Sequence, residues 1–171
     1  DFLRSLTPLL VDLFEHILKN QGYDIRKYFL KSKIPTEESY RWDRIALEYS
    51  EAADPLAKGI LNQLYQNHTS LNKTLFVSSS ELSAFIQNES SFTQEVKDLT
   101  QQLREIERQV RNLAAHQIVS ISEQMIKNKT GLTPQQIMVL LRKAFGYTNM
   151  HISASNPAWD SYIQMNELIN D

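Results

Sequence analysis

Residues 96–113 read VKDLTQQLREIERQVRNL, and their apolar positions follow one regular pattern. Successive apolar residues are alternately three and four apart, at Val96, Leu99, Leu103, Ile106, Val110 and Leu113. This heptad-like spacing predicts one long helix, from about Phe92 to Lys127, with a single apolar seam. The seam packs lengthwise on another helix, either within the chain or across a dimer. We favour packing within the chain, because amphipathic helices commonly bury their apolar face locally.

Helical patterns also surround this stretch. An N-cap residue stands directly before proline at four places, at Thr7-Pro8, Asp54-Pro55, Thr133-Pro134 and Asn156-Pro157. Each pair precedes apolar residues of helical period, so we expect a helix to begin there. Thr36 is predicted to cap a further helix over residues 37–50, and Gly146 to end the helix that starts at Pro134. Only Lys73–Ser78 indicates a strand, and the chain is therefore predicted to be an all-α bundle.

The composition excludes several classes of protein. The chain has 171 residues, of which 42% are hydrophobic and 22% charged, as in a globular domain with its own core. It contains no cysteine, which excludes disulfides, thiolate nucleophiles and zinc–thiolate sites. A net charge of -2 excludes a uniformly basic nucleic-acid-coating protein but allows a local basic patch. No apolar run reaches the roughly 18 residues of a membrane span, so we expect no membrane association and a cytoplasmic location.

The predicted long helix carries a polar string, Arg111-Asn112-Leu113-Ala114-Ala115-His116, beside its seam. With about 100° per residue, Asn112 lies about 100° and His116 about 140° round the helix from Arg111. The seam centres near about 250°, on roughly the opposite side. Ala115 is small and lets another surface approach closely. The helix is therefore expected to present a guanidinium, an amide and an imidazole to a partner.

A basic ridge is predicted on the same side of this helix. Arg104, Arg108 and Arg111 are spaced i, i+4 and i+7, and the ridge ends beside Asn112 and His116. Arginine forks match phosphate oxygens, and imidazole moves protons near neutral pH. The ridge is therefore a candidate path for an RNA backbone towards the histidine. The alternative is a face that is only solvated, because glutamates and glutamines share the same helix.

No pattern in the sequence indicates a bound metal or an organic cofactor. The four histidines do not share a metal-ligand spacing and lie at His16, His68, His116 and His151. The chain also lacks a phosphate-binding glycine loop, a G-x-S-x-G elbow, an H-E-x-x-H motif and an EF-hand loop. We therefore expect chemistry that uses side chains alone, with neither cofactor nor metal.

The Arg-Asn-x-x-x-His string of residues 111–116, on a long helix of an all-α chain, resembles the active-site motif of the HEPN superfamily (higher eukaryotes and prokaryotes nucleotide-binding). With its surroundings it resembles the C-terminal HEPN domain of the Csm-type CRISPR-associated ribonuclease of type III-A systems. These surroundings are Val110–Ser120, Thr130-Gly131 and Ile137–Phe145. The similarity is clearest over about residues 103–171. On this resemblance residues 1–171 form a single HEPN ribonuclease domain, in which about residues 1–66 include part of a preceding connecting helical region.

This resemblance implies a metal-independent endoribonuclease that cleaves single-stranded RNA. It further implies a homodimer, in which two motifs meet across the interface in one composite active site. Arg111 would neutralise the phosphate, Asn112 would orient the histidine or the phosphate, and His116 would act as general base or acid. Attack by the RNA 2′-hydroxyl would leave a 2′,3′-cyclic phosphate and a 5′-hydroxyl.

The resemblance also implies a part that we do not find in the sequence. In the full-length family a CARF domain, which is Rossmann-like, precedes the HEPN domain and binds cyclic oligoadenylate made by the activated type III CRISPR complex. The chain starts at Asp1 without an initiator methionine and shows no alternation of strands and helices. We therefore expect the effector part of a longer antiviral-defence protein, with the CARF domain absent. This part is not expected to bind cyclic oligoadenylate itself.

Two alternative functions stay open on the sequence alone. The first is a HEPN toxin ribonuclease of a toxin–antitoxin pair, which a partner protein silences. The second is a non-catalytic helical dimerisation scaffold, in which Arg111 and His116 only pair or cap at a dimer face.

Overall fold

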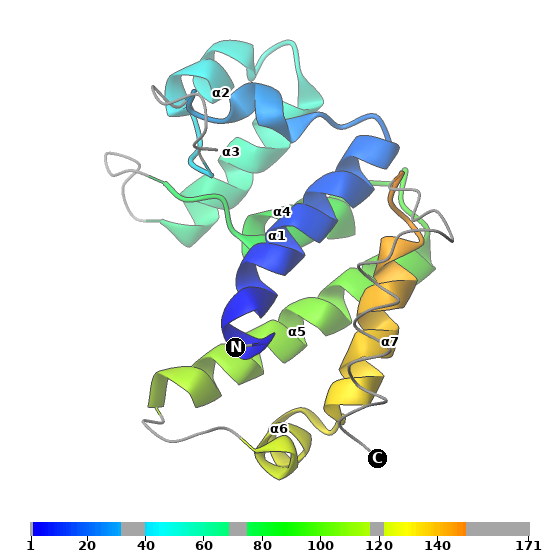
Figure 1. Cartoon of the computed structure of the whole chain (residues 1–171). Helices are drawn as coiled ribbons and strands as arrows, with labels where there is room; N and C mark the ends of the chain where they lie inside the picture. The colour runs from blue at the N-terminus through cyan, green and yellow to red at the C-terminus, as the bar shows by residue number, and fades with distance from the viewer. Residues whose placement is uncertain (1, 32–39, 69–74, 117–121, 150–171) are drawn as a thin grey trace.

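The computed structural model describes residues 2–31, 40–68, 75–116 and 122–149, with side chains described outside residues 2–5 and 112–116. Its helical elements are α1 (Phe2–Asn20), the 3-10 helix η1 (Ile25–Tyr28), α2 (Arg44–Ser50), α3 (Pro55–Asn67), α4 (Ser79–Asn88), α5 (Gln94–His116), α6 (Glu123–Thr130) and α7 (Pro134–Phe145). Within these ranges no strand forms, and extended segments meet only at two isolated bridges. The predicted all-α fold is therefore confirmed (Figure 1).

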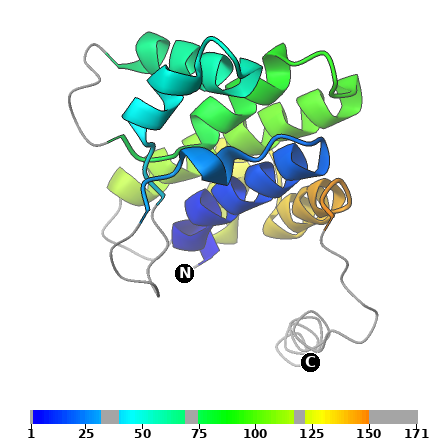
Figure 2. The same ribbon diagram turned by 90° about the horizontal axis from the view of Figure 1, so that it is seen from above.

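Helix α5 organises the bundle (Figure 1). It contacts α1, α4, α6 and α7, so both early and late helices of the described chain pack on it. Figure 2 shows α1 between α7 and α4. Helices α2 and α3 pack on each other, α3 contacts α4, and α2 contacts η1, which in turn contacts α1. No helix within the described ranges is long and apolar enough to cross a membrane.

This packing buries the apolar seam of α5. Five of its six predicted members are buried, at Val96, Leu99, Leu103, Ile106 and Val110. The side chain of the sixth, Leu113, lies outside the described residues. Since α5 contacts four helices of its own chain, the packing within the chain that we favoured is confirmed for these five residues. Each fully buried aliphatic side chain contributes about 1.5–3 kcal/mol, so the seam is a main source of stability.

The long helix predicted from Phe92 to Lys127 is wrong in its extent. Helix α5 covers Gln94–His116, and α6 is a separate helix that begins at Glu123. Ser122 precedes α6 with an extended backbone, and its side chain accepts a hydrogen bond from the amide of Met125. A serine in this geometry is an N-cap, which starts a new helix and does not continue an old one.

Two of the four helix starts that we predicted at an N-cap residue followed by proline are confirmed. Asp54-Pro55 starts α3 and Thr133-Pro134 starts α7, and in both the cap side chain accepts a backbone N–H of the first turn. Gly146 is the C-cap of α7, as predicted. The pair at Asn156-Pro157 lies outside the described residues.

The helix start predicted at Thr7-Pro8 is wrong, because α1 begins at Phe2 and Pro8 lies inside it. Leu6 is buried and shares the inward face of α1 with Leu10, one turn further on. Burial of Leu6 extends the apolar stripe beyond the proline and offsets the backbone hydrogen bond that proline cannot donate. Pro8 itself is exposed.

The helix predicted over residues 37–50 is also wrong in its extent. Helix α2 begins only at Arg44, after the segment Tyr40–Trp42, which is not helical. Trp42 is buried and forms an isolated bridge with Phe29, so tertiary packing overrides the helical pattern here. Thr36, the predicted cap, lies outside the described residues.

The strand indicated at Lys73–Ser78 lies partly outside the described residues, and residues 75–78 form only a short paired segment. The amide of Trp42 donates to the carbonyl of Leu75, and the amide of Val77 donates to the carbonyl of Tyr40, each at 2.8 Å. Leu75 and Val77 are buried, which ties this connection to the core next to α3 and α4. Two hydrogen bonds satisfy these backbone groups without building a sheet.

Candidate active site

The predicted catalytic string lies at the C-terminal end of α5. The backbone of α5 is helical through His116, which places Asn112 and His116 one turn apart; their side chains lie outside the described residues. The side chain of Arg111 is described and is 60% exposed. Its neighbour Val110 is buried in the seam. Arg111 therefore faces solvent at the end of a helix whose other side is fixed in the core.

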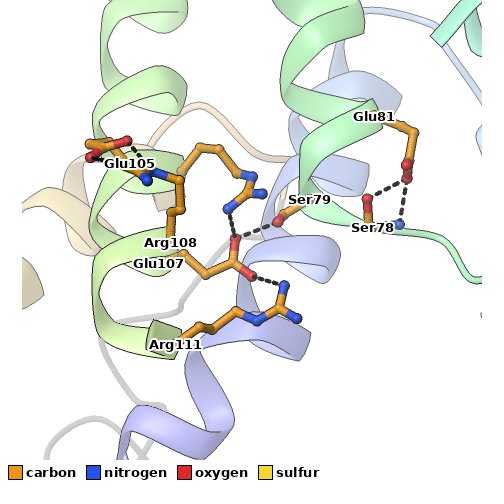
Figure 3. Close-up of polar contacts among 8 residues, drawn as sticks. Ser78, Ser79, Glu81, Glu105, Glu107, Arg108 and Arg111 are labelled. Atoms are coloured by element: carbon orange, nitrogen blue, oxygen red, sulfur yellow. Dashed lines mark hydrogen bonds and ion pairs between the residues drawn. The ribbon is translucent and has the colours of Figure 1, made fainter. Parts of the chain in front are cut away.

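A buried carboxylate stands behind Arg111. Glu107, one turn earlier on α5, is fully buried, and its Oε1 lies 4.0 Å from Nη1 of Arg111. Its Oε2 accepts a hydrogen bond from Oγ of Ser79 (Figure 3). It also accepts one from Nη1 of Arg104 at 3.4 Å. Within the described part of the chain, Oε1 accepts no hydrogen bond. Two guanidiniums thus share one carboxylate, and Arg111 is the more exposed of the two.

The start of α4 holds this carboxylate from the opposite side. Ser78 caps α4 and forms a capping box with Glu81, which places Ser79 at the first helical position. Ser79 is buried, and its hydroxyl donates to Glu107 across the contact between α4 and α5 (Figure 3). A carboxylate is costly to bury unless it is paired and hydrogen-bonded, and this one has a hydroxyl and two arginines around it.

The buried position of Glu107 was not predicted from the sequence. A signal was present, because Glu107 follows Arg104 by three residues and precedes Arg111 by four, and such spacings place opposite charges together on a helix. That spacing alone does not predict burial. Burial depends on α4, whose Ser79 covers this side of α5.

Arg108 belongs to a different cluster on α5. Its Nε and Nη2 donate to the two carboxylate oxygens of Glu105 at 2.9 and 2.7 Å (Figure 3). Hydrogen bonds from Arg108 and from a neighbouring glutamine lower the pKa of Glu105 to about 2. The predicted ridge of three arginines is therefore divided, since Arg104 and Arg111 flank Glu107 whereas Arg108 pairs with Glu105. Substrate binding by Arg104 and Arg108 stays a prediction.

A groove of about 440 Å³ runs beside α5. It is lined by Asp98, Gln101, Gln102, Glu105, Ile106 and Gln109 of α5 and by Thr130 and Leu132. Residues 102, 105 and 109 are three and four apart, and the same spacing continues to Asn112 and His116, so the groove lies on the helix face of these two motif positions and not on that of Arg111. Two carboxylates in the lining disfavour a phosphate inside the groove, whereas Arg111, on another side of α5, attracts an anion.

The other histidines do not lie on α5. His16 is half-buried in α1, and His68 is exposed directly after α3, with its Nε2 3.9 Å from Oε1 of Glu81. His151 lies outside the described residues. Among the side chains that the structure describes, no group of three or more histidines and carboxylates could hold a metal ion.

An all-α bundle whose long helix ends in Arg-Asn-x-x-x-His has the architecture and the motif of a HEPN ribonuclease domain. The family model of the Cas_Csm6 HEPN domain matches residues 1–170, and the chain therefore belongs to this family. This confirms the resemblance found in the motif and extends it over the helices of the first half. The chain is thus a HEPN ribonuclease domain of the CRISPR-associated kind. No curated protein matches the chain.

Proposed function

We propose that this domain is a metal-independent endoribonuclease that cleaves single-stranded RNA as the effector of type III CRISPR antiviral defence. One observation carries the proposal: Arg111 is exposed and precedes His116 by five residues at the C-terminal end of α5, and neither position belongs to the buried seam. A guanidinium and an imidazole at one helix end are the groups that RNA cleavage by side chains requires. Membership of the Cas_Csm6 HEPN family supports RNA as the substrate.

In the proposed reaction the 2′-oxygen attacks the adjacent phosphorus, and the bond from phosphorus to the 5′-oxygen breaks. His116 takes the proton of the 2′-hydroxyl as general base, or gives a proton to the departing 5′-oxygen as general acid. Each role is typically worth about 10²–10⁴-fold in rate. Arg111 neutralises the charge that builds on the non-bridging oxygens, and Asn112 orients the imidazole or the phosphate. The products are a 2′,3′-cyclic phosphate and a 5′-hydroxyl.

Arg104 and Arg108 are proposed as weaker contacts to the same RNA backbone. Arg108 is 58% exposed but shares its charge with Glu105, and Arg104 is only 25% exposed. Arg104, Arg108 and Arg111 carry three positive charges and pair with two glutamates. This group of five side chains therefore has a net charge of +1. Arg111 is therefore expected to do most to neutralise the scissile phosphate as charge builds in the transition state.

We also propose a homodimer with a composite active site. The reaction needs a base and an acid, whereas each copy contributes a single His116 to its motif. Two copies that meet at the C-terminal ends of their α5 helices would supply both groups. In this proposal cyclic oligoadenylate acts through a CARF domain of the longer protein and not through the helices described above.

The proposal is tested with a strand that contains one ribonucleotide in a DNA background. The expected result is cleavage only after the ribonucleotide, with a 2′,3′-cyclic phosphate and a 5′-hydroxyl at the new ends, and no cleavage by Arg111→Ala. A matched strand that carries a 2′-O-methyl group at the same position should stay intact. Cleavage of the methylated strand, or products with a 5′-phosphate, would contradict the proposal, because neither result is compatible with attack by the 2′-oxygen.

A further inference from the structure

We propose that Glu107 is a positioning residue for Arg111, and this inference rests on the proposed function. From inside the bundle its carboxylate restrains one end of the guanidinium, so that the other end faces the RNA phosphate. This inference rests on one observation: the carboxylate of Glu107 is fully buried and lies 4.0 Å from the guanidinium of Arg111, whose side chain is 60% exposed.

The carboxylate of Glu107 is itself restrained by groups on two helices. Ser79, at the start of α4, donates its hydroxyl to Oε2, and Arg104, one turn earlier on α5, donates to the same oxygen. Both Ser79 and Glu107 are buried, so neither side chain has space to take another rotamer freely. Oε1 is thereby held on the side of Arg111 (Figure 3).

The contact between Glu107 and Arg111 restrains the guanidinium without occupying its hydrogen-bond donors. At 4.0 Å the two atoms attract each other by charge but are too far apart for a hydrogen bond. A guanidinium has five N–H donors in a rigid fork, and a phosphate needs two of them. Arg111 can therefore keep its approach to Glu107 and still donate two parallel hydrogen bonds to an RNA phosphate.

Like-charge repulsion makes the carboxylate necessary in this arrangement. Arg104 and Arg111 approach opposite oxygens of the same group, so Glu107 is the only described anion that both contact. Without its negative charge the two guanidiniums repel each other, and Arg111, the exposed one, is free to move into solvent. A misplaced guanidinium stabilises the transition state less, whereas substrate binding by the remaining contacts is little changed.

The experiment measures kcat and KM for single-stranded RNA with Glu107→Gln, which keeps the size of the side chain and removes its charge. We expect kcat to fall about tenfold or more while KM changes by less than about threefold.

Glu15→Gln is the matched control. Glu15 is also a buried carboxylate of the bundle, one of its oxygens also accepts no hydrogen bond from the described residues, and it also pairs with a partly exposed arginine, Arg26. Glu15→Gln should lower the melting temperature about as much as Glu107→Gln but leave kcat within about twofold. This comparison separates a role in positioning from a role in stability.

The outcomes are distinguishable. If Glu107→Gln cleaves like Glu15→Gln while Arg111→Ala does not cleave, the inference on Glu107 is wrong and the proposed function stands. If Arg111→Ala cleaves like the wild type, the proposed function is wrong, and the inference falls with it. If Glu107→Gln does not fold, Ser79→Ala decides the question, since it removes one restraint on the carboxylate and keeps the charge. A lower kcat for Ser79→Ala supports the inference, and an unchanged kcat overturns it.

Discussion

Arg111 differs from the other two arginines of the predicted ridge in what surrounds its guanidinium. Arg108 forms a two-pronged pair with an exposed carboxylate, and Arg104 is mostly covered and hydrogen-bonded to Glu107. Arg111 is exposed and makes no hydrogen bond within the described part of the chain, only an ion pair at 4.0 Å. Among the three side chains it is therefore the one best prepared to bind a phosphate.

The pair of Arg108 with Glu105 leads to a prediction on RNA binding. Glu105→Gln should release Arg108, raise the affinity for single-stranded RNA and steepen the dependence of log affinity on log salt by up to about 0.7, the value for one further phosphate contact. Because the pKa of Glu105 is about 2, its carboxyl stays ionised between about pH 5 and pH 8, and the effect should be equal at both. Binding is measured by fluorescence anisotropy in a His116→Ala background, which prevents cleavage.

The control for this measurement is the double variant Glu105→Gln with Arg108→Gln. It should show no gain in affinity over Arg108→Gln alone, because the gain needs the arginine. An equal gain in the double variant would mean that Glu105 repels RNA directly and that Arg108 takes no part.

The contact between α3 and α4 depends on a glycine. A Cβ at Gly59 of α3 would lie 2.5 Å from Cε2 of Phe85 on α4. Phe85 is buried and packs edge-to-face on Tyr23, with ring centroids 5.2 Å apart, so its ring cannot shift without disturbing a second contact. Helix packing here therefore requires the smallest residue.

Gly59→Ala should therefore destabilise the domain, although alanine favours a helix by about 1 kcal/mol over glycine. We expect the free energy of unfolding to fall by about 1–3 kcal/mol, because overpacking outweighs helix propensity. Urea unfolding measures the change, with Lys58→Ala at the adjacent exposed position of α3 as a control that should change it by less than about 0.5 kcal/mol. A Gly59→Ala variant that is more stable than the wild type would contradict the close approach of α3 and α4.

The cap of α3 predicts a dependence of stability on pH. Burial tends to raise the pKa of Asp54, but hydrogen bonds from Lys27, Tyr28 and the amide of Leu56 outweigh it, and the net pKa is lowered from 3.8. Nζ of Lys27 lies 2.6 Å from Oδ2 of Asp54. A lowered folded-state pKa adds stability above the unfolded-state pKa, and this stability is lost as the pH falls through the folded-state pKa.

Asp54→Asn should keep the cap and lose this charge contribution. Its free energy of unfolding should be lower than that of the wild type by about 1 kcal/mol, equally at about pH 7 and pH 5, and the difference should shrink at about pH 3 and below. Urea unfolding at these values tests it, with Asp43→Asn, which changes the cap of α2, as the comparison. A difference that grows as the pH falls would show that Asp54 has the opposite pKa shift.

At the scale of the elements, prediction from the sequence was most accurate for features that depend on a single local rule, such as residue spacing or helix capping. The seam of α5 and the Thr133-Pro134 start of α7 follow from spacing and capping chemistry, and both are confirmed. The start of α1 was missed because burial of Leu6 outweighs the effect of Pro8. The segment before α2 was missed because Trp42 pairs with a distant connection, and no local pattern shows that partner.

The candidate site was predictable only in part for the same reason. The string that includes Arg111 is visible in the sequence, and so is the spacing that places Asn112 and His116 one helical turn apart. That Glu107 is buried and contacts Arg111 follows from the position of Ser79 on α4, which is 28 residues away along the chain. Such contacts between helices decide which charges face solvent, and spacing along one helix does not contain that information.

In the whole molecule, the α5 seam is buried within one chain, and this limits the surfaces through which two copies can associate. The described part of α5 already packs on α1, α4, α6 and α7, so a second copy must contact other faces. The motif-bearing face is by register one of those left over, which agrees with the proposed composite site. A site shared between two copies should work only when the copies associate, and its rate should then rise more steeply than linearly with protein concentration.

The most direct test of this account is cleavage of a fluorescent single-stranded RNA in EDTA over a series of protein concentrations. The wild type, His116→Ala and the control His68→Ala are compared, since His68 is an exposed histidine outside the candidate site. We predict that the wild type and His68→Ala cleave with a rate that rises faster than linearly with concentration. His116→Ala should lose about 10²-fold or more. Cleavage that stops in EDTA, or that continues unchanged in His116→Ala, would contradict a metal-independent site built on the end of α5.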